Sequence, residues 1–239
     1  MVLSVIDYYN GITSLVFVVI SFIIGLKLIH KYYKYKVAEL GLVGLTWLGV
    51  CEVWIPTAVS FITVLFFGLT LSPELYFILA FTYMPIAMLF WLIAITKLLY
   101  QEKKALILTS YLIYALTFEI ILFYLLLTNP SCIGERVRLL EATYTMWMYA
   151  YLVSIASIFF ITGILFAWKS LKSDNKETKL KAKFLLTAQI TLYIISLLEA
   201  FFTHGPMTFI IYKIFLISSA FEFYLSFFLP EWLKNILSR

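Results

Sequence analysis

Residues 11–30 read GITSLVFVVISFIIGLKLIH, a run of twenty residues in which Lys27 is the one charged side chain. A helix of about twenty apolar residues spans the hydrocarbon core of a bilayer. Six further apolar runs follow, at roughly 40–70, 75–100, 105–127, 143–168, 180–203 and 207–229, and the connections between them are short. The sequence therefore predicts an all-α integral membrane protein, a seven-helix bundle over residues 1–229.

The composition agrees with this fold class. Hydrophobic residues make up 63% of the 239 residues, charged residues only 13%, and the mean hydropathy is +0.98. A soluble domain is about half apolar and about a quarter charged. An outer-membrane barrel needs segments of alternating polarity, whereas these runs are continuous. The net charge of +5 does not indicate nucleic-acid binding, because the basic residues lie in short connections rather than on one folded face.

Two of the runs contain a proline. The run 40–70 is longer than a bilayer requires, and Pro56 is expected to kink it while neighbouring helices satisfy the freed carbonyl. Pro85 is expected to do the same in the run 75–100. We therefore interpret each run as one bent span.

The cationic residues predict the orientation. Of the 18 Lys and Arg residues, 15 fall on one side of a seven-span layout, Arg136 and Arg138 fall on the other, and Lys213 lies within a span. Connections rich in Lys and Arg remain in the cytoplasm. The pattern predicts a multi-pass protein of the cell membrane with its N-terminus outside and its C-terminus in the cytoplasm.

The connection 169–183 is the most basic one. Asp174 and Glu177 have the spacing of a capping box, which predicts that a helix begins there in water. Lys176, Lys179 and Lys183 then share a face, which is suited to anionic lipid or to an acidic cytoplasmic protein. The simpler alternative is that these lysines only anchor the topology.

Residues 230–239 follow the last run as a short amphipathic tail. Trp232, Leu233, Ile236 and Leu237 would share one helical face, so we expect a short interfacial helix on the inner leaflet. The chain carries no recognisable output domain, so any signal would pass to a separate protein.

Ionisable residues inside the runs are the candidate functional residues, because a charge within the bilayer is costly. Glu199 lies seven residues before Pro206 and Lys213 seven after it, so the two are predicted to lie at similar depth and to form an ion pair. Glu119 is also placed in the outer half. We expect these three residues to line an outward-opening cavity for a small polar ligand. The alternative is that each charge only fixes helix packing.

Glu52 and Glu222 are placed in the inner half of the bundle. A buried carboxyl group without a partner tends to take up a proton. The two side chains are therefore interpreted as hydrogen-bond donors between helices, with a proton pathway as the alternative.

Catalytic chemistry finds little support. The two histidines, His30 and His204, are predicted on opposite sides of the bilayer, and Asp7 and Asp174 lie outside the runs. These residues supply neither a zinc ligand set nor an aspartyl pair. Lys213 is an unsuitable retinal lysine, since the run 75–100 offers no acidic counter-ion. We predict no enzyme activity, no metal site and no cofactor.

Seven stretches within and between the runs are distinctive: Val43-Gly-Leu-Thr-Trp47, Trp54-Ile-Pro56, Ser72-Pro-Glu-Leu-Tyr76, Thr128-Asn-Pro-Ser131, Ser170-Leu-Lys-Ser-Asp174, Ile217-Ser-Ser-Ala-Phe-Glu-Phe-Tyr224 and Leu229-Pro-Glu-Trp-Leu233. Along nearly the whole chain they resemble uncharacterised seven-helix membrane proteins of archaea, particularly of the Asgard group. The layout is also similar to sensor domains that precede histidine kinases. The resemblance implies a stand-alone membrane protein and assigns no functional residue.

The function expected from the sequence is that of a receptor-like or sensor-like membrane protein. It would bind a small molecule or lipid in an outer-half cavity. The alternative is a small-solute or proton-coupled transporter, and a purely structural membrane protein is a third interpretation.

Overall fold

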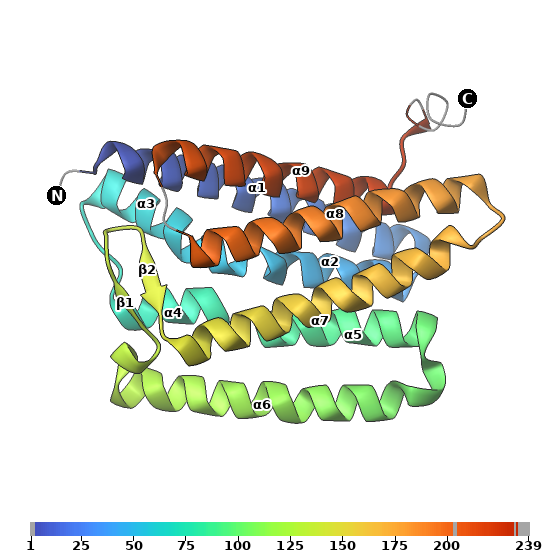
Figure 1. The fold of residues 1–239 in the computed structure, drawn as a ribbon, viewed down its shortest axis with the longest axis horizontal. Helices are drawn as coiled ribbons and strands as arrows, with labels where there is room; N and C mark the ends of the chain where they lie inside the picture. The colour runs from blue at the N-terminus through green and yellow to red at the C-terminus, as the bar shows by residue number, and fades with distance from the viewer. Residues whose placement is uncertain (1–2, 203–204, 232, 234–239) are drawn as a thin grey trace. The chain divides into compact units, whose positions relative to one another are not determined.

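The computed structural model describes residues 3–202, 205–231 and 233, and these are largely helical (Figure 1). Within them, seven helical segments are long and apolar enough to cross a membrane: Val5–Tyr35, Ala38–Phe67, Pro73–Leu99, Gln101–Thr128, Met146–Leu171, Lys176–Phe201 and Met207–Phe227. Each segment overlaps one of the predicted runs. The all-α class and the expected seven helical segments of membrane-spanning length are therefore confirmed among the described residues, while most of the predicted tail helix lies outside them.

Five of the seven candidate spans each contain one long helix, and each of the other two is divided into two shorter helices. The long helices are α1 (Val5–Tyr35), α6 (Lys104–Thr128), α7 (Met146–Leu171), α8 (Lys176–Phe201) and α9 (Pro206–Phe227). The second span comprises α2 (Ala38–Val50), the 3₁₀ turn η1 (Glu52–Trp54) and α3 (Ile55–Phe67). The third comprises α4 (Pro73–Phe81) and α5 (Met84–Leu99). Two further 3₁₀ turns, η2 (Gln101–Lys103) and η3 (Pro130–Cys132), flank α6.

Polar caps set the ends of several helices. At the start of α1, the Ser4 hydroxyl accepts from the backbone N–H of Asp7, and the Asp7 carboxylate accepts from the backbone N–H of Ser4. At the start of α8, the Asn175 side chain accepts from the N–H groups of Glu177 and Thr178. The predicted cap at Asp174 was therefore one residue early, because Asn175 supplies the accepting oxygen.

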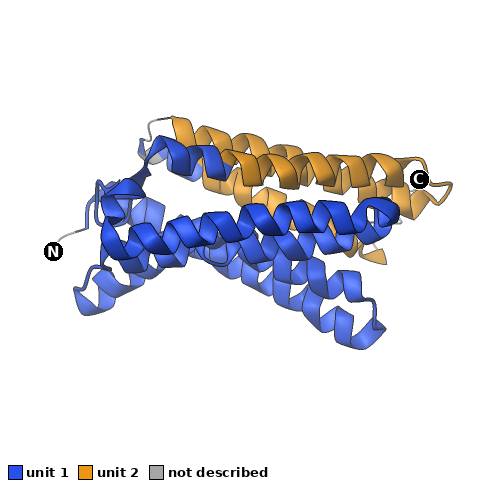
Figure 2. Cartoon of the chain, turned by 90° about the horizontal axis from the view of Figure 1, so that it is seen from below, with its two compact units in different colours: residues 1–152, 204–210 blue, residues 153–203, 211–239 orange. Residues whose placement is uncertain are grey.

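The chain divides into two compact units, which are described separately (Figure 2). The first comprises residues 1–152 and 204–210, and its buried core includes Phe17, Trp47, Phe77 and Trp91. Helices α2 and α5 approach closely there: a Cβ atom on Gly49 would lie 2.1 Å from the Cβ of Ala87. The second unit comprises residues 153–203 and 211–239. The prediction of one bundle over 1–229 stays a prediction.

Side-chain contacts join α7 and α8 in the second unit. The hydroxyl groups of Ser157 and Tyr193 are 2.9 Å apart, and the Tyr193 ring stacks on Phe160. Close to Gly163, the Gln189 side chain occupies the space that a Cβ would need. A small residue on α7 therefore lets the buried amide of α8 approach its backbone.

A β-hairpin that the apolar pattern did not predict lies between α6 and α7. Strands β1 (Gly134–Arg136) and β2 (Ala142–Tyr144) are antiparallel, with Arg136 opposite Ala142. The Arg136 guanidinium donates to the carbonyl groups of Leu71 and Leu139 and lies 5.1 Å from the centre of the Tyr76 ring. Burial lowers the pKa of Arg136, but a guanidinium remains charged at any physiological pH.

The tip of this hairpin is packed into the first unit. Leu140 is fully buried against Leu3, Phe61 and Val64. Its carbonyl accepts from the Thr57 hydroxyl at 3.1 Å and from the Tyr76 hydroxyl at 3.3 Å. The hairpin is thus an ordered cap on the ends of α3 and α4 rather than a loose loop (Figure 1).

Candidate functional site

Proline causes both helix breaks. Pro56 and Pro85 stand in the first turns of α3 and α5, where proline is tolerated because the first N–H groups of a helix have no partner within it. Neither proline can donate to the carbonyl four residues earlier, so α2 does not run on into α3 and α4 does not run on into α5. The predicted kinks are confirmed, and each is a full break.

Glu52 joins the two breaks. It lies in the turn η1, close to the middle of the segment Ala38–Phe67. Its Oε1 atom accepts from the backbone N–H of Tyr83, at 2.7 Å, immediately before α5 begins. An accepting oxygen is favoured there, because the start of a helix carries unpaired N–H groups and partial positive charge. The Glu52 side chain therefore caps the half-helix of a neighbouring span.

Burial leaves the second carboxyl oxygen of Glu52 without a partner. The residue is 3% exposed, and among the described residues no group hydrogen-bonds to its Oε2 atom. None of the ion pairs among those residues includes Glu52 either. A buried polar atom in this state costs free energy and calls for a partner.

A partly open cavity of about 320 Å³ has Glu52 among its lining residues. Its apolar lining comes from four helices of the first unit, and its polar lining from the two breaks. The lining residues are Phe22, Leu48, Glu52, Ile55, Ile78, Leu79, Thr82 and Tyr83. Mainly apolar cavities of this size with a few placed polar groups are typical of small-molecule sites.

The other two polar side chains that line the cavity use their hydroxyl hydrogens in hydrogen bonds to backbone carbonyls. The Thr82 hydroxyl donates to the carbonyl of Ile78 at 2.9 Å. The Tyr83 hydroxyl donates to the carbonyl of Leu45 at 3.1 Å. Each hydroxyl oxygen keeps acceptor capacity. The hydroxyl hydrogens of Thr82 and Tyr83 are therefore already used within the protein.

A layer of aromatic residues lies on the α6 side of the same unit. The Tyr111 hydroxyl donates to the carbonyl of Pro85, at 2.9 Å, within the first turn of α5. Further along α6, Phe118 stacks on Tyr151 from the start of α7. Glu119 follows on α6, half-buried, and its Oε1 atom has no hydrogen-bond partner among the described residues.

Lys213 and Glu199 lie in the second unit and form the predicted ion pair, which is confirmed. The Lys213 ammonium donates to Glu199 Oε1. The Lys213 side chain is 1% exposed and the Glu199 side chain 16%. Glu119 belongs to the first unit, so the proposed ligand site of all three residues stays a prediction.

Glu222 is also in the second unit. It accepts from the Ser218 hydroxyl at 3.1 Å, one turn earlier on α9. Its Oε2 atom has no hydrogen-bond partner among the described residues. Glu222 thus hydrogen-bonds to a residue of its own helix, whereas Glu52 hydrogen-bonds to a residue of the neighbouring span.

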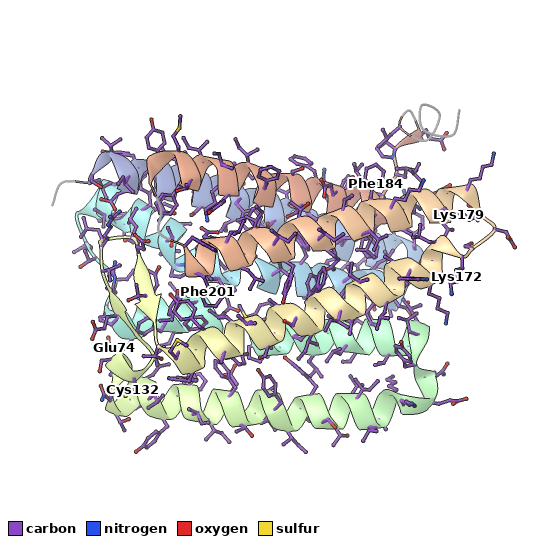
Figure 3. The ribbon with its side chains drawn as sticks, viewed as in Figure 1. Glu74, Cys132, Lys172, Lys179, Phe184 and Phe201 are labelled. Carbon is purple, nitrogen blue, oxygen red and sulfur yellow. The ribbon has the colours of Figure 1, made fainter. Side chains whose placement is uncertain are left out.

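The three predicted surface lysines lie at the start of α8. Lys176, Lys179 and Lys183 are all exposed, and Figure 3 shows Lys179 and Lys172 at the turn between α7 and α8, with Phe201 at the opposite end of α8. Lys181 pairs with Glu177 at 2.8 Å. The basic face formed by Lys176, Lys179 and Lys183 is therefore present.

The sequence indicated Glu52 as a candidate residue but did not indicate the residues that lie beside it. Tyr83 and Thr82 are a span away in the sequence and carry no charge. The one available signal was the echo between Trp54-Ile-Pro56 and Tyr83-Met-Pro85, two prolines that each follow an aromatic residue in adjacent spans. This echo indicates where the two helices break, but it does not indicate that the two breaks contact each other.

No protein-family model, curated protein or solved structure matches this chain. The resemblance to archaeal seven-helix proteins and the likeness to kinase sensor domains therefore stay predictions.

Proposed function

We propose that this chain is a receptor-like or sensor-like multi-pass protein of the cell membrane that binds a small molecule or lipid in the cavity beside Glu52. The observation that carries the proposal is a mainly apolar cavity at two adjoining helix breaks, lined in part by the buried residue Glu52, whose carboxyl group bonds one break to the other. Irregular backbone at membrane depth is tolerated where protein buries it or where it lines a cavity.

The Glu52 cavity supports binding better than the predicted outer-half site does. Lys213 and Glu199 neutralise each other, so a ligand there would have to compete with an existing ion pair. Glu52 has no cationic partner among the described residues, and it is one of the residues that line a cavity.

The remaining parts of the proposal concern placement and partners. The N-terminus lies outside, and the basic face at the start of α8 contacts anionic lipid of the inner leaflet. Ligand binding changes the geometry of the two breaks, and that change is read by a separate cytoplasmic protein. No catalytic step is assigned to the chain.

The test is ligand-dependent thermal stability of the purified chain in a non-ionic detergent. n-Octylamine, n-octanol, octanoate and a phosphatidylglycerol form the first panel. A ligand that binds the native state raises the unfolding temperature by mass action. Leu79→Trp fills the cavity, and Leu75→Trp changes an exposed residue one turn earlier on α4 and serves as its control.

At least one compound should stabilise the wild type and Leu75→Trp while leaving Leu79→Trp unchanged. Stabilisation that is the same in all three proteins, or absent from all three, would reject the cavity as the binding site.

A second function is favoured by one feature, the pair of broken helices. Discontinuous helices whose half-helix ends meet at mid-membrane are typical of secondary transporters. Substrate-dependent, proton-coupled uptake into proteoliposomes, lost in Glu52→Gln, would favour a transporter. Saturable binding without flux would favour the receptor-like function.

A further inference from the structure

We infer that the occupant of the Glu52 cavity is the acyl chain of a bilayer lipid, which enters from the hydrocarbon core of the membrane. The inference rests on the proposed function and narrows its ligand from a small molecule or lipid to one chemical class. It follows from the polar groups of the cavity, from its depth and from the surface beside which it opens.

The described polar side chains of the lining offer an occupant no accessible donor. Glu52 Oε1 accepts from the backbone N–H of Tyr83, and the Oε2 atom is buried. The hydroxyl hydrogens of Thr82 and Tyr83 bond to backbone carbonyls. A polar head placed here would lose its hydration without gaining a matching set of partners. The surface of the cavity is almost wholly apolar, so the lining favours an apolar group.

The cavity lies at the depth of the hydrocarbon core. Phe22 stands in the middle third of α1, and Glu52 stands in the middle third of the segment Ala38–Phe67. The core is about 30 Å thick and a helix rises about 1.5 Å per residue, so residues within about ten positions of the middle of a span lie inside it. Lipid chains are the molecules that surround a span at this depth.

The cavity opens beside an exposed apolar face of α1. Phe22, which lines the cavity, is 39% exposed, and the exposed positions around it on α1 are Val19, Ile23 and Leu26. On α3, Ile55 lines the cavity and also keeps partial exposure. An aqueous entrance would need polar walls, whereas apolar side chains exposed at this depth contact lipid tails. A chain can therefore enter sideways from the bilayer.

Packing, rather than dehydration, holds the chain in the cavity. A lipid chain is already in an apolar solvent, so it gains little by leaving it. An empty space of about 320 Å³, however, leaves the atoms of its lining without partners on one side, and these lost dispersion contacts cost free energy. A flexible acyl chain fills the space and restores the contacts. Because the two helix breaks line this space, occupancy by a chain supports their geometry.

The experiment is photocrosslinking of the full chain in nanodiscs of a phosphatidylcholine whose acyl chain carries a diazirine near its middle. After irradiation and proteolysis, mass spectrometry measures the labelling of each residue. We expect Phe22, Ile55 and Ile78 of the cavity to be labelled more heavily than exposed residues of α6 outside the cavity, although those residues are more exposed than Phe22. The α6 residues for this comparison are Ile113, Leu116 and Ile120.

Two variants locate the label. Leu79→Trp fills the cavity and should remove the excess labelling of its lining, while the labelling of α6 stays unchanged. Leu75→Trp, which changes an exposed residue one turn earlier on α4, should keep the excess. Excess labelling that persists in Leu79→Trp would place the chain outside the cavity and overturn the inference. If Leu79→Trp does not fold, the comparison of the cavity with α6 in the wild type decides the matter.

The outcomes also separate this inference from the proposed function. If the cavity is labelled no more than α6, the acyl chain is the wrong class. In that case, a compound of the thermal-stability panel that stabilises the wild type but not Leu79→Trp would leave the cavity as a binding site for another ligand. If neither the labelling nor the stabilisation depends on Leu79, the proposed function and the inference both fail.

Discussion

Lys213 shows how a full positive charge is held inside the second unit. An unpaired charge within a bilayer is expensive, and the Lys213 ammonium is almost completely removed from solvent. Glu199 stands two residues before the end of α8 and keeps slightly more exposure, so the pair connects a deep cation to a carboxylate near the helix end. The two residues fix α8 and α9 in one register.

Breaking this pair should therefore destabilise the chain more than replacing it. Glu199→Leu leaves Lys213 buried without its carboxylate and should cost roughly 3 to 5 kcal/mol. Lys213→Met should cost less, because Glu199 can be hydrated at the helix end. The double variant should lose less than the sum of the singles, with a coupling above about 1 kcal/mol in unfolding by a denaturing detergent. Additive losses would show that the two side chains are energetically independent.

The sequence predicts this residue pair but not the environment of Glu52, for a geometric reason. Glu199 and Lys213 flank one turn, so equal offsets from Pro206 place them together without further knowledge of the fold. Glu52 and Tyr83 belong to spans that are joined by a loop at one end and broken in the middle. Tertiary packing decides which turn of one span contacts which turn of the next. The apolar pattern of the sequence does not predict that contact.

The first unit contains the two spans that are divided into two helices each. Pro56 and Pro85 predict where the helices break, and the structure adds that the broken ends are bonded through Glu52. The hairpin between α6 and α7 could not be predicted from hydropathy, because one leucine, one arginine and hydrogen bonds to backbone carbonyls hold it in place. Close packing of α2 on α5 then holds the breaks in place.

That packing can be tested at Gly49. Gly49→Ala would bring two Cβ atoms to 2.1 Å, so the helices must separate, and overpacking of this kind costs about 1 to 3 kcal/mol. Adding Ala87→Gly removes the opposing methyl group and should recover most of the lost thermal stability. Gly205→Ala, where an added Cβ meets nothing within 4 Å, is the control without overpacking, and its loss should not exceed that of a helix cap. If the double variant is no more stable than Gly49→Ala, the close approach of α2 and α5 is not what limits this position.

In each of the two compact units, exposed lysines lie at one set of helix ends. In the first unit, Lys34 and Lys97 lie near the ends of α1 and α5, whereas the hairpin with Arg136 caps the opposite ends of α3 and α4. In the second unit, Lys172 and Lys179 mark the turn between α7 and α8 (Figure 3). Apart from the buried Lys213, the lysines named here therefore lie at one set of helix ends in each unit, which is the pattern expected of cytoplasmic connections.

The two cysteines make this orientation measurable. Cys132 is exposed in the turn before the hairpin (Figure 3), and Cys51 is buried. A single span, α7, separates Cys132 from the connection around Asp174. In intact cells, a membrane-impermeant maleimide should label the wild type, and Cys132→Ser should abolish the labelling. Asp174→Cys on that background should react only after the membrane is permeabilised, because the positive-inside rule places the α7–α8 turn in the cytoplasm. Labelling of Asp174→Cys from outside, with Cys132 silent, would reverse the orientation; labelling of both from outside would mean that α7 does not cross the membrane.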